Sequence, residues 1–528
     1  MRDKYSKLAI ILGLIVAVIL AGCSAEESSS NNQLPQEEAE EQTQGEETRS
    51  AVSEDEKYGG KVTIRFPYQP TSLGYLPDLI PPTAVLPIVQ PALETLGRYN
   101  PDGTMGPWLA TDWQLDPESK TITVELREGV KFHDGSDFNA DAVKWVFDTA
   151  IEAKRPLSTT LERVEVVDSH TVRFHLNTWT TGILHDMFWI YPIASPTAFE
   201  KMGKDGVMFH PVGTGPFKFD AYEPDQYVRY VRNENYWQEG KPYLDEIEIR
   251  LITDNNTALN AFLGGEIDVA VQLTGDMADQ YKDTTDFELV PVETTVGLEM
   301  RGLVANSIDK QSPLADPNVR KAISYAINRE EIAQALFKGY VTPTSQFFME
   351  GSPFYNPDLE AFEYNPEKAK QLLAEAGYPD GFSTKLIGQP PESVILQAVQ
   401  GYLAEVGITA EVEICERARY LAMAMTEGWD GLITYTTTTQ NELGSMLRPH
   451  FGPDANTWGP FVDRPDELLQ LISQFEQEID NEIRKEIADE LQKVFFEKYH
   501  LANMIYIEKI PYFKHKHVKD AGFYTNRA

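Results

Sequence analysis

The amino-acid sequence predicts a mixed α/β protein with interrupted domains. Some short segments alternate apolar and polar residues, as strands do, and longer ones place apolar residues three and four positions apart, as helices do. The two kinds of segment mix without strict βαβ alternation, and no repeat with a period of about 20 to 50 residues is present. With 528 residues, 42% of them hydrophobic, the chain can bury a large core in one very large domain or in two to three ordinary ones.

The chain begins with the pattern of a secretory signal. Arg2, Lys4 and Lys7 precede an apolar run that extends from Leu8 to Leu20. A transmembrane helix needs about 20 apolar residues, and this run is shorter. We therefore expect residues 1–22 to be a signal peptide and not a membrane span.

The end of this signal carries the motif Leu20-Ala21-Gly22-Cys23. It resembles the lipobox of bacterial lipoproteins, in which the cysteine is diacylated and becomes the mature N-terminus. The resemblance implies that Cys23 is lipidated and that the protein is anchored to the cell membrane, facing the extracytoplasmic space (periplasm or cell exterior). Cys415 is the only other cysteine, so lipidation would leave it without an intramolecular disulfide partner.

Residues 23–57 are expected to form a lipidated, acidic, disordered tether. They are rich in Glu, Gln and Ser and contain no aromatic residue, so they have too little apolar surface to offset the entropy of ordering. The whole chain has a formal net charge of −36, which argues against nucleic-acid binding because that needs clustered Lys and Arg. Solubility is the favoured explanation of the charge, and a cationic ligand is the alternative.

The folded part opens with a predicted strand, Lys61–Phe66, in which apolar and polar residues alternate. A proline-punctuated apolar stretch from Leu76 to Leu96 ends in a short predicted helix. Thr121–Leu126 is the clearest strand, because every second residue is apolar. Asn139 is then a predicted helix N-cap, since its side chain can accept a backbone hydrogen bond. The apolar stripe of this helix is Ala142, Val143, Val146 and Phe147.

Further strands and helices are predicted along the rest of the chain. A helix is expected from Asn365, with Pro366 in its first turn and Gly377 just past its end. Asp466–Tyr499 holds a long helical pattern. The predicted strands are Val164–Val167, Thr171–Leu176, Tyr227–Arg232 and Ile247–Ile252.

Three blocks of the sequence resemble the solute-binding protein family 5 of peptide, nickel and opine ABC importers. Their order and spacing are similar to those of the family from Tyr58 to the C-terminus. Glycines in these blocks make turns and aromatic residues fill cores, so the blocks identify a fold and not a ligand. The blocks are Trp113–Phe147, with Leu126–Gly135 as its most distinctive stretch; Val212–Phe217 with Arg232–Trp237 and Gly265–Asp268; and Asp316–Arg329 with Tyr364–Pro366 and Ala376–Tyr378.

The resemblance implies a two-lobed, periplasmic-binding-protein-like α/β fold with a hinge, a discontinuous lobe I and an extra inserted domain. In such proteins the lobes close about the hinge and enclose the ligand. We place lobe I at residues 58–91, 212–303 and 505–528. The inserted domain II is expected at residues 92–211, and lobe II at residues 304–504.

The ligand-binding motifs of the best-known relatives are not found at their expected place. Peptide-binding relatives carry an acidic residue in an Asp-Tyr-x-x-Pro segment after an apolar strand, and it pairs with the peptide amino group. The corresponding segment here, Trp429–Asn441, lacks that motif. Thr437 and Thr438 stand where nickel-binding relatives carry Trp-Gly. These residues therefore predict neither ordinary peptide recognition nor direct nickel-chelate binding.

A hydroxyl-rich strand, Thr434–Thr439, remains as the predicted pocket wall. It can hydrogen-bond a polar ligand, and Arg448 can hold a carboxylate or phosphate through two nitrogen atoms. The alternative is that threonines favour strands and that Arg448 forms a surface ion pair. The predicted ligand-binding residues are Trp189, Tyr191, Tyr435, Thr437, Thr439, Asn441, Arg448 and Trp458.

The resemblance implies the substrate-binding component of an ABC importer of the peptide/nickel class. Such a protein delivers a small polar or peptide-like ligand to permease and ATPase subunits. We expect a monomer without a metal or other cofactor, and no enzymatic activity, since the Gly-x-Ser-x-Gly, His-Glu-x-x-His and phosphate-loop signatures do not occur. A ligand-sensing or adhesive surface lipoprotein and a carbohydrate-active enzyme stay open as alternatives.

Overall fold

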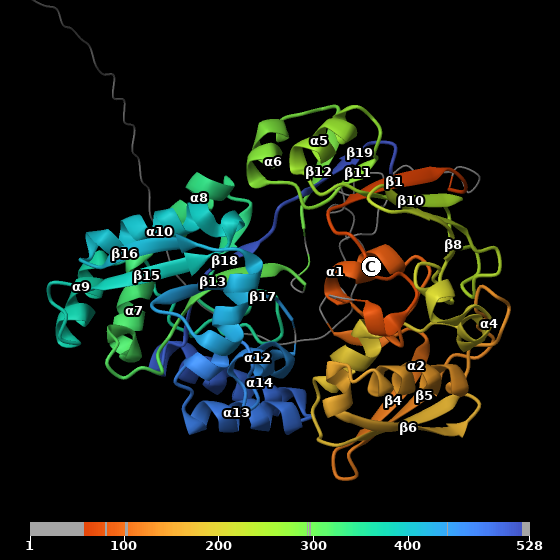
Figure 1. Ribbon diagram of the computed structural model, residues 1–528, viewed down its shortest axis with the longest axis horizontal. Helices are drawn as coiled ribbons and strands as arrows, with labels where there is room; N and C mark the ends of the chain where they lie inside the picture. Colours follow the sequence, from red (N-terminus) through yellow and green to blue (C-terminus); the bar gives the residue numbers. More distant parts are fainter. Residues whose placement is uncertain are drawn as a thin grey trace, which may run out of the picture. The chain divides into compact units, whose positions relative to one another are not determined.

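The computed structural model of the chain describes residues 57–79, 82–100, 104–292, 294, 297–440 and 442–519. In this part of the chain the strands form two large and two smaller sheets (Figure 1). The predicted signal peptide, Cys23 and the tether as far as residue 56 lie outside the described residues.

The first large sheet has seven strands in the order β12-β19-β11-β1-β10-β9-β8. Its middle strand, β1, is parallel to β10 and β11, whereas the other pairs are antiparallel. Helices α5 (Asn255–Leu263) and α6 (Gly275–Tyr281) lie between its strands in the sequence. The strands are β1 (Lys61–Phe66), β8 (Phe217–Glu223), β9 (Tyr227–Arg232), β10 (Glu246–Leu251), β11 (Val269–Ala270), β12 (Phe287–Val290) and β19 (Tyr512–His515).

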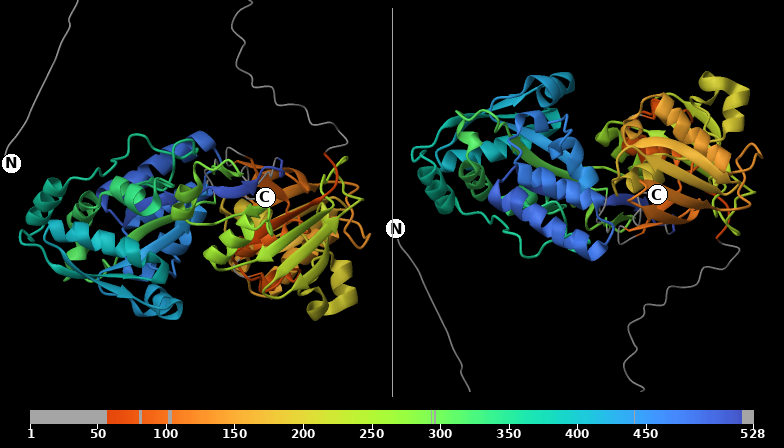
Figure 2. Two further views of the ribbon diagram at one scale, coloured as in Figure 1. Left: turned by 90° about the horizontal axis from the view of Figure 1, so that it is seen from above. Right: turned by 90° about the horizontal axis from the view of Figure 1, so that it is seen from below.

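The chain between β1 and β8 forms a four-stranded antiparallel sheet of its own, in the order β4-β5-β7-β6. Helix α2 (Ala140–Glu152) lies along one face of this sheet (Figure 2). The predicted cap is confirmed, because Asn139 Oδ1 accepts a hydrogen bond from Ala142 N at 3.0 Å. The strands are β4 (Ala110–Asp116), β5 (Thr121–Leu126), β6 (Leu161–Asp168) and β7 (Thr171–Leu176).

The same part of the chain contains a small hairpin and three further helical segments. The hairpin pairs β2 (Gly97–Tyr99) with β3 (Met105–Pro107). A short helix, α3, continues directly into a π-helical turn at Asp186–Ile190. The helices are α1 (Pro82–Val89), α3 (Ile183–His185) and α4 (Pro196–Val207).

The second large sheet has six strands in the order β14-β18-β13-β17-β15-β16. β15 is parallel to β16 and β17, and the other pairs are antiparallel. A large apolar core formed by residues between Leu298 and Ile507 packs around it. The strands are β13 (Glu299–Ala305), β14 (Val341–Pro343), β15 (Ser383–Gly388), β16 (Thr409–Ile414), β17 (Leu432–Thr438) and β18 (Ala502–Glu508).

Helices surround this second sheet, and α10 packs on β15 and β16 (Figure 1). The sequence pattern at Asp466–Tyr499 is helical as predicted, but it divides into two helices. Asp480 causes the division, because its side chain accepts from the backbone N–H groups of Glu482 and Ile483 and starts a new helix. The helices are α7 (Pro317–Ala326), α8 (Arg329–Phe337), α9 (Pro366–Glu375), α10 (Ser393–Glu405), α11 (Arg417–Ala422), α12 (Leu443–Phe451), α13 (Asp466–Gln477) and α14 (Asn481–Gln492).

The chain passes between the two large sheets at two places. It leaves the seven-stranded sheet after β12 and enters the six-stranded sheet at β13, and it returns between β18 and β19. The return segment has only three residues, Lys509–Pro511, between the strands. Two such crossings are what a hinge between two sheet-based lobes requires.

Candidate functional site

The threonine-rich segment forms β17, between β13 and β15 in the six-stranded sheet. Because side chains alternate along a strand, Thr434, Thr436 and Thr438 point to one face, and Tyr435 and Thr437 point to the other. The two faces contact different elements, α10 on the first and α12 on the second. The segment is therefore not one continuous hydroxyl-lined wall.

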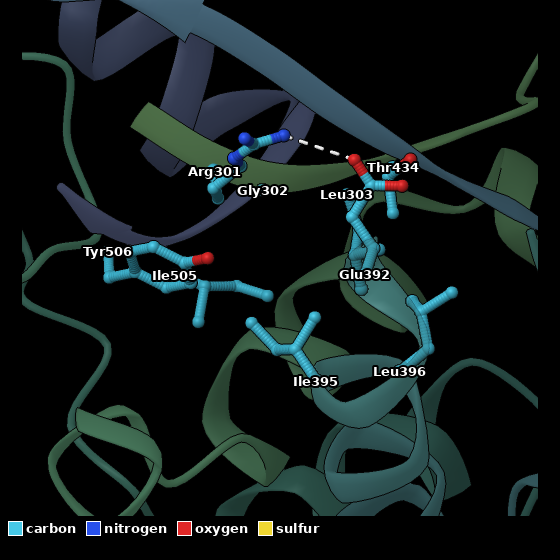
Figure 3. Close-up of a pocket in the computed structure, with 9 residues that line it drawn as sticks. All are labelled: Arg301, Gly302, Leu303, Glu392, Ile395, Leu396, Thr434, Ile505 and Tyr506. Carbon is cyan, nitrogen blue, oxygen red and sulfur yellow. Dashed lines mark hydrogen bonds and ion pairs between the residues drawn. The ribbon is translucent and has the colours of Figure 1, made fainter. Parts of the chain in front are cut away.

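The first face of β17 contacts Arg301 of β13. Its guanidinium donates to Thr436 Oγ1 at 2.8 Å and to Glu392 Oε1 at 3.0 Å, and the second of these contacts is drawn in Figure 3. The small pocket beside these groups is lined by Thr434 and by apolar side chains of α10 and β18 (Figure 3). It has room for about one water molecule, far less than a small-molecule ligand needs. This face therefore holds a structural ion-pair network.

The second face of β17 carries an aromatic cluster of Tyr435, His450 and Trp458. The ring centroids lie 5.6 Å apart for Tyr435 and His450, 5.1 Å for Tyr435 and Trp458, and 4.9 Å for His450 and Trp458. Within the described part of the chain, His450 Nδ1 is buried without a hydrogen-bond partner, whereas the hydroxyl of Tyr435 lies near Thr437 and the indole of Trp458 lies near Tyr420. Buried polar groups are almost always satisfied, so we expect a water molecule or a ligand group at this cluster.

The backbone and the protonation state of this cluster are both unusual. Trp458 has a φ of 54°, which is rare for a bulky residue and persists only where surrounding contacts enforce it. Burial lowers the pKa of His450 to about 4 and raises the pKa of the Tyr435 hydroxyl. At neutral pH the cluster is therefore uncharged, and it can exchange hydrogen bonds with a polar group.

The other predicted residues of this strand have different surroundings. Thr437 shares the face of Tyr435 and is 9% exposed. Thr439 is buried and accepts a hydrogen bond from the backbone N–H of Leu298 at 3.0 Å, which gives it a structural role. Asn441 lies outside the described residues.

Arg448 lies on α12 and is already paired. Its Nη1 is 2.9 Å from Glu476 Oε2, and its Nη2 is 3.2 Å from Asp454 Oδ2. The Glu476 side chain is only 6% exposed, so Arg448 neutralises a buried carboxylate. Arg448 therefore forms ion pairs in this structure, as the alternative interpretation of the sequence expected.

A loop of the inserted segment meets the α12–α13 region. The Thr181 backbone N–H donates to the carbonyl oxygen of Glu476 at 2.8 Å, and the Thr181 hydroxyl lies 3.4 Å from Glu442 Oε2. Arg484 also donates to Glu442 Oε2, at 2.6 Å. A Cβ placed on Gly182 would lie 2.1 Å from Ser445 Oγ, so only glycine fits this contact. Two segments far apart in the sequence therefore meet here at close range.

Next to this contact, the inserted segment presents a second polar and aromatic group. Tyr99 Oη lies 2.5 Å from His185 Nδ1, and the rings of Tyr99 and Trp189 pack edge to face with centroids 5.5 Å apart. Burial lowers the pKa of His185 to about 4, so this histidine is neutral at pH 7. Trp189, a predicted site residue, belongs to this group, whereas Tyr191 packs on Phe147 of α2 at 5.9 Å.

Asp186 is the charged member of this group. Its side chain is half-buried, and surrounding protein raises the pKa of its carboxyl from 3.8 to about 7. Among the described residues no hydrogen bond or ion pair to this carboxylate is found. The nearby carboxylates differ, since Glu442 has Arg484 and Glu476 has Arg448 as partners. Asp186 is thus the one of these three acids without a cation.

Sequence reasoning missed His185, Asp186, Glu442 and His450. A signal for the first two was present, because a charged pair stands inside the otherwise apolar run Ile183–Ile190. Such a pair in an apolar segment is either satisfied in the core or placed at a site. Glu442 and His450 gave no local signal, since their surroundings depend on segments remote in the sequence.

The described residues contain one further surface pocket of note. A surface pocket of about 350 Å³ lies between β15 and the turn after α11, and its charged lining includes the ion pairs Lys385–Glu413 and Arg419–Glu427. No group of three or more His, Cys, Asp and Glu side chains in the described ranges could hold a metal ion. Among the helices described, none combines the length and the apolar composition needed to cross a bilayer.

Comparison with known sequences gives matches to one family of transport proteins. The sequence model of the bacterial extracellular solute-binding proteins, family 5 (middle region), matches residues 104–458. The glutathione-binding protein GsiB of Salmonella typhi is 36% identical over 315 residues, which are 58% of this chain and 60% of GsiB. GsiB of Shigella flexneri is similar to the same extent. The chain thus spans about 60% of the length of these curated relatives.

Solved structures show the same architecture. A periplasmic binding protein, DppA, from Helicobacter pylori in complex with the peptide STSA has a TM-score of 0.73 and 23% identity, covering 90% of this chain and 97% of DppA. NikA from Brucella suis in complex with Fe(III)-EDTA has a TM-score of 0.76 and 24% identity, covering 86% of this chain and 95% of NikA. The predicted fold class, a two-lobed α/β binding-protein fold, is therefore confirmed.

Proposed function

Since the chain belongs to the bacterial extracellular solute-binding proteins of family 5, we propose that it is the substrate-binding component of an ABC importer of the peptide/nickel class. It captures a small polar or peptide-like ligand and delivers it to permease and ATPase subunits. The observation that carries this proposal is the close meeting of the inserted segment with the α12–α13 region, at Thr181 and Gly182. In such proteins the ligand is enclosed when segments on either side of it close toward each other.

The names of similar proteins indicate the first ligands to test. Glutathione is in the name of the curated relatives, and a peptide is bound in the DppA structure. Both are small, flexible, polar molecules with charged ends. Their cationic amino groups suit Asp186, which has no cationic partner among the described residues, so glutathione and short peptides are the first candidates.

The lobe arrangement is part of the same proposal. Lobe I, at residues 58–91, 212–303 and 505–528, contains the seven-stranded sheet, and lobe II, at residues 304–504, holds most of the six-stranded sheet. Strands β13 and β18 run across the proposed boundaries after residues 303 and 504. The two crossings between the sheets act as the hinge, and ligand binding closes the lobes.

The proposed ligand-binding residues come from both sides of the site. Tyr435, Thr437 and Trp458 supply the lobe II side, and Trp189 supplies the side of the inserted segment. The contacts of Arg448 and Thr439 support structural roles for these two residues. Tyr191 and Asn441 stay proposed as ligand contacts.

We propose lipidation at Cys23 as the anchor, because the lipobox is the narrowest motif in the sequence. In cells, radiolabelled palmitate should be incorporated into the wild-type protein and not into Cys23→Ala, which should leave the membrane fraction. Label retained in the variant would contradict the proposal. The protein is also proposed to bind without chemistry, so incubation with its ligand should return the ligand unchanged.

The binding proposal is tested by native mass spectrometry and small-angle scattering. Protein purified without unfolding should retain a small ligand, and saturating ligand should reduce the radius of gyration. Trp458→Phe keeps most of the ring volume but removes Nε1, so it should weaken glutathione or peptide binding about 3- to 10-fold. Trp145→Phe, on α2, is the matched control and should bind as the wild type does. Absence of both a retained ligand and compaction across a broad panel would contradict the function.

A further inference from the structure

Asp186 occupies a position where a carboxylate is costly unless something binds it. Its surroundings raise the pKa of its carboxyl to about 7, which means that the charged form is poorly solvated there. A structural carboxylate at such a place normally has an ion-pair or hydrogen-bond partner, as Glu442 and Glu476 do. In the described part of the chain Asp186 has neither.

The direction of the Asp186 side chain follows from the helical turn that carries it. The Asp186 N–H lies 3.4 Å from the carbonyl oxygen of Gly182, so the two residues are one turn apart. Residues four apart share a helix face, and the Gly182 face packs on Ser445 of α12. Asp186 therefore belongs to the side of the turn that faces the six-stranded half of the molecule.

The neighbours of Asp186 suit a cation. Tyr99 is close to both carboxylates. Burial raises the pKa of its hydroxyl, and the negative charges of Glu442 and Asp186 raise it further. Trp189 packs on the same Tyr99 ring. Aromatic faces attract ammonium and guanidinium groups, and this attraction strengthens where water is excluded. Arg448 already pairs with Glu476 and Asp454, and Arg484 with Glu442, so neither guanidinium is available to Asp186.

We infer that Asp186 binds the cationic group, an ammonium or a guanidinium, of the captured ligand. The inference rests on the proposed function and deepens it. The carboxylate for this purpose comes from the inserted segment, on the π-helical turn Asp186–Ile190. The ligand class is therefore a small molecule with a free cationic group, such as a peptide with an unblocked N-terminus.

The test compares Asp186→Asn, which keeps the side-chain shape and removes the charge, with the wild type. The probes are glutathione and trialanine, each with a free and with an acetylated amino group, and binding is measured by titration calorimetry. The wild type should bind the free forms about 10- to 100-fold more tightly than the acetylated forms, and Asp186→Asn should lose this preference. Asp205→Asn, on the exposed side of α4, is the matched control and should keep it.

The outcomes separate the inference from the function. If the wild type binds but shows no preference, or if Asp186→Asn keeps the preference, the inference is overturned and the function stands. A retained ligand without a cationic group, identified by native mass spectrometry, overturns it as well. If the wild type binds no probe and retains no ligand, the proposed function fails and the inference falls with it. A retained cationic ligand that Asp186→Asn loses supports both.

Folding of the variant is verified by a melting temperature no lower than that of the wild type, because an unpaired charge has been removed.

Discussion

Trp237 Nε1 donates a hydrogen bond to Glu94 Oε2 at 2.9 Å. The same carboxylate accepts from Trp108 Nε1 at 2.7 Å, from Tyr236 Oη at 2.7 Å and from Thr214 Oγ1 at 2.8 Å. Two segments of the second sequence block that resembles family 5, Val212–Phe217 and Arg232–Trp237, thus converge on one buried acid. Their residues are fixed by architecture, which explains why such blocks identify the fold and leave the ligand open.

Glu94→Gln should lower the free energy of unfolding by about 2 to 3 kcal/mol. One oxygen of the carboxylate accepts from Trp108 and the other from Trp237. An amide can place its oxygen toward only one of these N–H groups, and its NH₂ group would face the other donor. Urea denaturation monitored by tryptophan fluorescence measures the change. Glu266→Gln, at an exposed turn, is the control and should change stability by less than about 0.5 kcal/mol; equal stability of both variants would refute the role of Glu94.

Arg448→Ala should destabilise the protein by about 1 to 2 kcal/mol, because it leaves the buried Glu476 without its cation. The loss of stability is modest because the Arg448 side chain is 35% exposed, so water partly screens its ion pair with Glu476. In a double-mutant cycle, Glu476→Gln combined with Arg448→Ala should recover part of the loss. A strictly additive double variant would show that the two residues are not coupled.

Gly182→Ala should disturb the contact between the inserted segment and α12. The new Cβ would lie 2.1 Å from Ser445 Oγ, and overpacking of this kind costs about 1 to 3 kcal/mol. Ser445→Ala removes the clashing oxygen, so the double variant should recover most of the stability. Differential scanning calorimetry of the single and double variants decides the point, and an unrescued double variant would contradict this geometry.

Asp186→Asn should gain stability over the wild type as the pH rises from about 4 to 7. The pKa of Asp186 is raised from 3.8 to about 7 in the folded protein, so between these values the folded state binds more protons than the unfolded state. The wild type therefore loses stability with rising pH, by up to about 1.4 kcal/mol per pH unit from this group, and the loss levels off above pH 7. The asparagine variant does not titrate. Ligand-free denaturation curves at several pH values measure the difference, which should be small near pH 4; a difference independent of pH would contradict the shift.

The local elements of the fold could be predicted from short stretches of sequence. The strands Lys61–Phe66, Thr121–Leu126, Thr171–Leu176 and Tyr227–Arg232 have their predicted limits, because their alternation matches the two-residue period of a strand. Val164–Val167 lies inside the longer β6, and β10 begins one residue before the predicted strand. Asp466–Tyr499 was predicted as one pattern, and it divides because a cap at Asp480 competes with continued helix.

The candidate site was less predictable. Tyr435 and Trp458 were singled out in the sequence, and the structure brings them together at 5.1 Å. Their third partner, His450, could not be identified, since its distance from Tyr435 depends on how α12 packs against β17. Arg448 has the residue type of an anion site, but its contacts with Glu476 and Asp454 depend on α13 and on a loop after α12.

The sequence by itself determined the elements and the family, because hydrophobic periodicity, caps and turn residues act between near neighbours along the chain. Tertiary structure alone decided which polar groups have partners. Among the described residues, Glu442 has Arg484 as its partner and Asp186 has no cation, because packing places one guanidinium nitrogen 2.6 Å from Glu442 and none beside Asp186. The free energy of a charge depends on such distances and on the exclusion of water, and neither is encoded by a residue's immediate neighbours in the sequence.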